Sequence, residues 1–338
     1  MFISIQRFHR SAVRIGCLAG AWLCALHILG CSSHTSPRIA IIPQTEGMSI
    51  WDAVHVGAES QAQRSALTVY WNAPTREDDV DGQIALVDHV THDRYQGLIL
   101  APSQSLALIS PVRRALERGI PTAIISSPLP LPHSANLINI VNDDELGGHL
   151  AAQRVVAMLN GHGTVALLGI NPDITGIMTR AHTFELELTR VAPGIEIVER
   201  HAGTFNALHE QQVAEDTLRA HPGLDVIIAL TWDTADGAYR AIESNANAHA
   251  TRIVAFDCIG IPAFDQWKRL DSIIQQNTRA MGQKAVEALN TRMRGGAMPA
   301  DMLVPPRLIT RDNISNADVR EMFSADLELW NWRWSLFK

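Results

Sequence analysis

Hydrophobic and polar positions follow two alternating patterns along most of the chain. Short runs of apolar residues are bounded by turn residues, and amphipathic stretches with the 3.6-residue period of a helix separate them. The runs that predict strands are 38–43, 67–71, 97–101, 121–126 and 137–141 in the first half, and 164–169, 195–201, 225–230 and 252–256 in the second half. The stretches that predict helices are 50–65, 80–92, 105–118, 144–159, 176–191, 206–220, 234–244 and 260–269.

This alternation predicts the fold class. Strands that are apolar at successive positions are buried on both faces, as they are in parallel sheets covered by helices. The strands are too many for one small sheet, and the 338 residues exceed one ordinary core. We therefore expect an α/β protein with two domains of similar construction.

The N-terminus has the pattern of an export signal. Arg7, Arg10 and Arg14 precede an uncharged, mostly apolar run over 15–29. This run is shorter than the roughly 20 residues that a spanning helix needs, so residues 1–30 are predicted to be a secretory signal peptide. The run closes with Ile28-Leu29-Gly30-Cys31, which resembles a bacterial lipobox. The resemblance implies cleavage before Cys31 and its acylation, whereas the alternative is an uncleaved anchor helix.

The segment that follows is suited to a tether. Residues 31–37 are small and polar, and Ser32 in place of Asp after the cysteine favours the outer membrane if the cell is Gram-negative. We expect the protein in the cell envelope, on the periplasmic side, anchored to the membrane through lipid on Cys31.

The charge of the chain excludes one class of partner. Its 28 basic and 35 acidic residues give a formal net charge of −7. Loss of residues 1–30, which carry three arginines and no acid, would leave 25 basic against 35 acidic residues, or −10. Nucleic-acid binding needs clustered Lys and Arg, so we expect no nucleic-acid partner.

Motifs of catalysis and metal binding are missing from the sequence. There is no G-x-S-x-G, P-loop or H-E-x-x-H pattern. His89 and His92 have no Cys or carboxylate partner at matching spacing, which argues against a metal site. Cys258 is the one cysteine beyond the N-terminal segment, so no disulfide can form within the folded body. We expect no enzymatic activity, no cofactor and no metal.

Five short motifs occur in register along the chain. In order, they are Val141-Asn142-Asp143 with Leu146-Gly147-Gly148, Arg180 with Phe184, His221-Pro222 before Trp232-Asp233, Ala255-Phe256-Asp257, and Gln276 six residues before Gly282. Through them the chain resembles, over residues 38–314, the periplasmic sugar-binding proteins of the ribose-binding type. The resemblance implies a type 1 periplasmic binding protein fold, in which two Rossmann-like domains with parallel sheets are joined by a three-strand hinge and close around a ligand.

The same resemblance implies where the domains divide. The N-terminal α/β domain would comprise 38–140 plus 277–302, and the C-terminal α/β domain 141–276 plus 303–314. The hinge strands would lie near 140–143, 257–260 and 275–278. Residues 315–338 form a Trp-rich C-terminal extension, which either packs on the second domain or contacts a membrane interface or partner.

The binding residues are expected in loops after strands, because ligands of open α/β sheets bind beyond the carboxyl ends of the strands. The resemblance implies aromatic walls at Trp51 and Phe205, and hydrogen-bonding groups on Arg180, Asp233, Asp257 and Gln276. Sugar rings have apolar faces and polar edges, so aromatic walls and fixed polar groups together recognise them. The alternatives are packing in the core for the two aromatic rings and helix capping for Asp233 and Asp257.

Four positions depart from the ribose-binding pattern. Trp232 stands where the family has a sugar-binding Asn, Met178 where ribose binders have an Arg, Ser126 and Ser127 where they have an Asp, and Met48 where a polar residue lies near Trp51. Each departure replaces a polar or charged group with an apolar or weakly polar one, and this weakens hydrogen bonding to a ligand hydroxyl. We therefore expect a deoxysugar, a sugar derivative or another small neutral solute rather than ribose.

The resulting functional prediction is solute capture. We expect a monomeric binding protein that delivers a small carbohydrate-like ligand to the permease of an ABC importer. The alternative is a component that presents the solute to a membrane sensor or chemoreceptor. A DNA-binding regulator would need a helix-turn-helix at residues 1–37, where the signal and tether lie instead.

Overall fold

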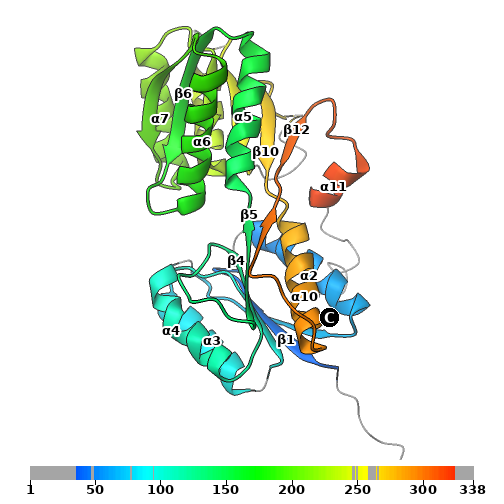
Figure 1. The fold of residues 1–338 in the computed structure, drawn as a ribbon. Helices are drawn as coiled ribbons and strands as arrows, with labels where there is room; N and C mark the ends of the chain where they lie inside the picture. Colours follow the sequence, from blue (N-terminus) through cyan, green and yellow to red (C-terminus); the bar gives the residue numbers. More distant parts are fainter. Residues whose placement is uncertain are drawn as a thin grey trace, which may run out of the picture. The chain divides into compact units, whose positions relative to one another are not determined.

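The computed structural model describes residues 36–323 except 47–48, 77, 94, 246–247, 249, 258–263 and 265 (Figure 1). Its strands form two six-stranded sheets, which confirms the predicted fold class. Lipidation at Cys31, the signal peptide and Cys258 lie outside the described residues. So do the Trp-rich part of the extension and most of the predicted helix 260–269.

Sheet A forms the core of the N-terminal domain. Its strands are β1 (Arg38–Ile42), β2 (Thr68–Trp71), β3 (Gly97–Leu100), β4 (Thr122–Ser126), β5 (Leu137–Asn142) and β11 (Asp301–Val304), in the order β11-β5-β4-β3-β1-β2. All neighbours in this sheet are parallel. Its helices are α2 (Ser49–Arg64), α3 (Val80–His92), α4 (Ser105–Glu117) and α10 (Thr278–Met293).

Sheet B forms the core of the C-terminal domain. Its strands are β6 (Gly163–Ile170), β7 (Ile195–Ala202), β8 (Val226–Ala229), β9 (Arg252–Phe256), β10 (Leu270–Gln275) and β12 (Arg307–Thr310), in the order β12-β10-β9-β8-β6-β7. Only β12 runs antiparallel to its neighbour. Its helices are α5 (Asp144–Leu159), α6 (Thr175–Val191), α7 (Ala207–Ala220), α8 (Trp232–Ser244) and α11 (Ala317–Phe323).

Helices cover both faces of each sheet, as the continuous apolar strands predict. In β1, Ile39 and Ile41 pack against α2 and α10, whereas Ala40 and Ile42 face α3 and α4. In the other sheet, α5 and α6 cover one face and α7 and α8 the opposite face. No helix among the described residues combines the length and apolarity that crossing a bilayer requires.

Glycines allow the paired helices to come into backbone contact. A Cβ added to Gly148 of α5 would lie 2.6 Å from the carbonyl oxygen of Arg180 on α6. A Cβ on Gly282 of α10 would lie 2.1 Å from the carbonyl oxygen of Val54 on α2. Both glycines belong to the sequence motifs described above, and their role in this structure is close helix packing.

The chain passes between the sheets at three points. Two of them, after β5 and after β10, fall within the predicted hinge segments 140–143 and 275–278. The third lies between β11 and β12, so the prediction at 257–260 is wrong, because β9 and β10 are neighbours in one sheet. The strands of the N-terminal domain reach Asn142 and Val304, two residues beyond the predicted limits of 140 and 302.

Candidate functional site

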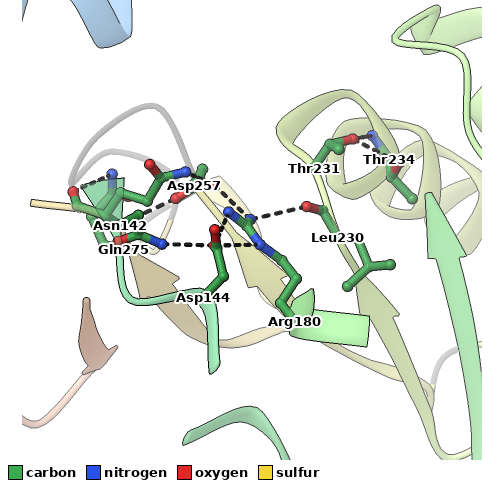
Figure 2. A network of polar contacts seen from close by, with 9 residues as sticks. Asn142, Asp144, Arg180, Leu230, Thr231, Thr234, Asp257 and Gln275 are labelled. Carbon is green, nitrogen blue, oxygen red and sulfur yellow. Dashed lines mark hydrogen bonds and ion pairs between the residues drawn. The ribbon is translucent and has the colours of Figure 1, made fainter. Parts of the chain in front are cut away.

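A polar network occupies the carboxyl edge of sheet B (Figure 2). Leu230, Asp257 and Gln276 directly follow β8, β9 and β10, whose carboxyl ends lie side by side because the three strands are parallel. Arg180 from α6 reaches this edge and joins the network. This is the edge at which ligands of open α/β sheets bind.

Arg180 lies at the centre of the network and is 4% exposed. Its Nη1 donates to Asp257 Oδ2 at 2.7 Å and to the carbonyl oxygen of Leu230 at 3.3 Å. Its Nε and Nη2 both donate to Asp144 Oδ1, at 3.1 and 2.7 Å. The guanidinium carbon lies 4.7 Å from the centre of the Phe256 ring. Burial alone would lower the pKa of Arg180, but the charges of Asp257 and Asp144 raise it above its ordinary value.

The carboxylate of Asp257 is fixed by three hydrogen bonds. Oδ2 accepts from Arg180 and from Gln276 Nε2 at 2.6 Å, and Oδ1 accepts from the backbone N–H of Gln276 at 3.1 Å. A carboxylate offers about four acceptor positions. Among the described residues, only the backbone N–H of Gln276 donates to Oδ1. The second acceptor position on Oδ1 is therefore available for a ligand hydroxyl. The structure thus brings together three residues predicted from sequence: Arg180, Asp257 and Gln276.

Asp144 completes the network and was missed in the sequence analysis. It is the first residue of α5 and accepts from Asn142 Nδ2 at 2.7 Å as well as from Arg180. Two carboxylates therefore share one guanidinium, which leaves a formal charge of −1 on the group. The sequence signal that could have identified Asp144 is its position directly after the Val141-Asn142-Asp143 motif. In that motif, Asp143 caps α5 by accepting from the backbone N–H of Leu146.

Trp232 belongs to a stack of three aromatic rings in the C-terminal domain. Its ring lies 4.8 Å from that of Trp267 with an interplanar angle of 9°, and Trp267 lies 4.7 Å from Tyr239 at 12°. Trp267 and Tyr239 were also missed from sequence. Tyr239 lies seven residues after Trp232 on α8, a spacing that places two side chains on one face of a helix.

Asp233 lies within the first turn of α8 and is not the N-cap of this helix. The helix begins at Trp232, and its N-cap is Thr231, whose Oγ1 accepts from the backbone N–H of Thr234. The alternative in which Asp233 caps a helix that starts at Thr234 is therefore wrong. Asp233 itself is half-buried in the first turn.

The other candidate residues do not join the network. Trp51 is 3% exposed and packs in the core between sheet A and the helices α2 and α10. Ser126 ends β4 in the same domain, and Ser127 follows it. Met178 on α6 and Phe205 before α7 are 39% and 47% exposed.

Three candidate residues have an uncommon backbone conformation. Among the described residues, five that are not glycine have a positive φ, and three of them are Ser126 (70°), Phe205 (57°) and Asp257 (55°). This conformation is unfavourable for residues with a Cβ, and it persists where the surrounding structure enforces it, commonly at functional sites. Each of the three lies at or just after the carboxyl end of a strand.

The described residues hold no group of three or more His, Cys, Asp or Glu side chains arranged to bind a metal ion. The network offers a fixed carboxylate acceptor and half-buried polar side chains instead. Such an arrangement can orient the hydroxyls of a small neutral molecule by hydrogen bonding.

The fold and this edge define a type 1 periplasmic binding protein. The chain belongs to the family described as "Periplasmic binding protein domain", whose model matches residues 39–297. Its relatives in this family are solute-binding proteins of the ribose-binding type and not enzymes.

Two curated proteins illustrate the relationship. The chain is 28% identical to the D-apiose import binding protein of Paraburkholderia graminis over 249 residues, which covers 72% of this chain and 78% of that protein. It is 24% identical to the D-ribose/D-allose-binding protein of Pseudomonas aeruginosa over 263 residues, which covers 76% of this chain and 81% of that protein.

A solved structure supports the fold. An ABC transporter solute binding protein from Agrobacterium vitis, bound with alpha-D-tagatopyranose, matches with a TM-score of 0.75 at 20% identity. The match covers 86% of this chain and all of that chain.

Proposed function

We propose that this protein binds a small sugar or sugar-like solute and delivers it to an ABC importer from the periplasmic side of the cell envelope. Membership of the periplasmic binding protein family and the sugar names of the relatives support this proposal. The ligand-binding residues that we propose are Trp51, Ser126, Ser127, Met178, Arg180, Phe205, Trp232, Asp233, Asp257 and Gln276.

The observation that carries the proposal is the fixed carboxylate of Asp257. Arg180 and Gln276 hold it in place, its backbone has a positive φ, and no other described residue occupies the remaining acceptor position on Oδ1. A carboxylate that is already oriented needs no reorganisation when it accepts a hydroxyl, and this lowers the entropic cost of binding.

We infer that the preferred ligand has fewer hydroxyls than ribose. Trp232 carries no acceptor, and its ring stacks on Trp267 and packs against the apolar core of the C-terminal domain. Met178 supports the same inference, since its exposed thioether cannot replace the hydrogen bonds of an arginine.

A carbohydrate panel tests this function. We expect saturable quenching or a spectral shift of tryptophan fluorescence with at least one sugar among ribose, allose, apiose, tagatose and their deoxy derivatives. We also expect a deoxysugar or derivative to bind at least tenfold more tightly than ribose, a difference of about 1.4 kcal/mol. Tight ribose binding would refute the inference about hydroxyl content, and no response to any sugar would refute sugar binding.

The panel does not separate importer from sensor, so uptake is the second measurement. If the protein serves an importer, its deletion should abolish uptake of the sugar that binds. Unchanged uptake would favour the alternative in which the protein presents the solute to a membrane sensor or chemoreceptor.

We further propose that Cys31 carries the lipid anchor, with removal of residues 1–30. The lipobox-like run Ile28-Leu29-Gly30-Cys31 supports this. Replacing Cys31 with alanine should abolish incorporation of radiolabelled palmitate and release the protein from the membrane fraction, because the acyl chains provide the attachment. Cys258→Ala serves as the matched control and should keep both label and membrane location. Equal labelling of C31A and the parent would contradict the anchor.

A further inference from the structure

A cavity lies in the C-terminal domain, at the amino edge of sheet B. Its volume is about 310 Å³, and Arg252 and Leu270, which begin β9 and β10, line it together with Thr310 at the end of β12. Asp257 lies at the opposite end of β9. With the usual rise per residue of a strand, it is roughly 15 Å from Arg252. The cavity is therefore separate from the candidate solute site.

The lining of this cavity is basic. It contains Arg154, Arg252, Lys268, Arg269 and Arg311, against Asp271 and Asp312, so five positive and two negative side chains give a formal charge of +3. The whole chain has a net charge of −7. A basic concavity on an acidic protein concentrates anions locally, because the concave wall focuses the field of its charges.

The wall of the cavity is rigidly built around a buried carboxylate. Asp271 is 7% exposed at its side chain and accepts from Arg154 Nε at 2.6 Å and Nη2 at 2.9 Å. Arg252 approaches the same carboxylate at 3.5 Å. The two bonds from Arg154 fix the plane of its guanidinium group, and the single longer contact draws Arg252 toward the same carboxylate.

A third arginine, Arg311, is held by contacts that do not involve Asp271. Arg311 Nη2 donates to the carbonyl oxygen of Trp267 at 3.2 Å, and its guanidinium carbon lies 5.6 Å from the centre of the Phe264 ring. Lys268 and Arg269 have no side-chain hydrogen bond or ion pair within the part of the chain that the structure describes. The cavity thus combines anchored guanidinium groups with two cations available to a ligand.

We propose that this cavity binds a phosphate group. Fixed guanidinium groups match the tetrahedral oxygens of phosphate through paired N–H donors, and a compact ammonium adds a point charge. Two sources supply this chemistry: free phosphate or a phosphate monoester in the surrounding solution, and the phosphodiester of a lipid head group. The proposal does not depend on the sugar-binding function.

Titration of the full chain with two soluble probes tests the proposal. Inorganic phosphate and glycerophosphoglycerol, the head group of phosphatidylglycerol without its acyl chains, would be titrated at 150 mM NaCl with phosphorus NMR and calorimetry. The double variant K268Q/R269Q should weaken binding of the preferred probe by about tenfold or more, because it removes the two cations without an internal partner. Melting followed by circular dichroism checks that the variant is folded.

A matched double variant controls for total charge. R113Q/K284Q removes one arginine and one lysine from α4 and α10 and should change affinity less than about twofold, since neither residue lines the cavity. Binding of phosphate alone assigns the site to free phosphate or a monoester, and binding of the diester alone assigns it to a lipid head group. The proposal is overturned if neither probe binds the parent, or if K268Q/R269Q binds as tightly as the parent.

Discussion

Replacing Arg180 with methionine should lower the free energy of unfolding of the C-terminal domain by about 3–5 kcal/mol. The guanidinium is 4% exposed and bonds to Asp144 and Asp257 at once. Its removal leaves two largely buried carboxylates without their cation, and uncompensated buried charges are costly. Urea denaturation followed by tryptophan fluorescence measures the change, since Trp232 and Trp267 belong to the same domain.

Two control variants test whether the loss of stability comes from the polar network around Arg180. Arg180→Lys keeps a positive charge but cannot bond both carboxylates with the geometry of a guanidinium, so its stability should lie between those of the parent and R180M. Arg219→Ala, on α7 of the same domain, breaks an exposed ion pair with Asp216 and should leave the denaturation midpoint unchanged. An R180M protein as stable as the parent would contradict a central role for Arg180 in this domain.

The architecture could be predicted from sequence because long, periodic elements dominate it. Strands such as β3 and β8 are buried at every position, and this gives them the continuous apolar runs of a parallel sheet. The predicted elements do not include β10, α10, β11 or β12. The strands β11 and β12 each have four residues, only one of them buried, and Pro305-Pro306 lies between them. A short, partly exposed strand at the edge of a sheet leaves almost no pattern in the sequence.

The misplaced hinge segment has a related cause. The segment 257–260 was placed by the resemblance to the ribose-binding type, through the Ala255-Phe256-Asp257 motif, and that motif marks the end of a strand without showing which strand follows. The destination of a chain after a strand depends on which strand it pairs with next. Here β9 pairs with β10 in the same sheet, although residues 257–269 separate the two strands along the chain. A local sequence pattern does not reveal a pairing over that separation.

The sequence predicted several residues of the candidate site, but it did not predict the contacts between them. The sequence predicted Arg180, Asp257 and Gln276 as separate members of the site through the family resemblance, and the structure brings the three together. Sequence could not indicate that the arginine points at the aspartate, because both groups are equally able to bind a ligand. Nor could it indicate that Trp267 stacks on Trp232, since the two rings come from separate segments and no spacing rule connects them.

Replacing Asp257 with asparagine should weaken binding of the sugar identified in the panel by about 100-fold, or about 2.7 kcal/mol. Asparagine has nearly the same shape and tolerates the positive φ of 55° at this position. Its amide oxygen can accept from Arg180 and from Gln276 Nε2, but its NH₂ group then replaces Oδ1, faces the backbone N–H of Gln276 and removes the acceptor position open to a ligand. A hydrogen bond between a ligand hydroxyl and a carboxylate is lost, and charge-assisted bonds of this kind are among the stronger ones.

The matched control is Asp144→Asn, which removes the other carboxylate from the same guanidinium. Asp144 bonds to Arg180 and Asn142, and its role in this structure is to hold the network. D144N should therefore lower stability while changing affinity less than about fivefold, whereas D257N should show its main effect on affinity. Calorimetric titration and urea denaturation of both variants separate these effects. If the two substitutions weakened binding equally, Asp257 would act through the shape of the domain, because a direct contact with the ligand requires the loss to be specific to Asp257.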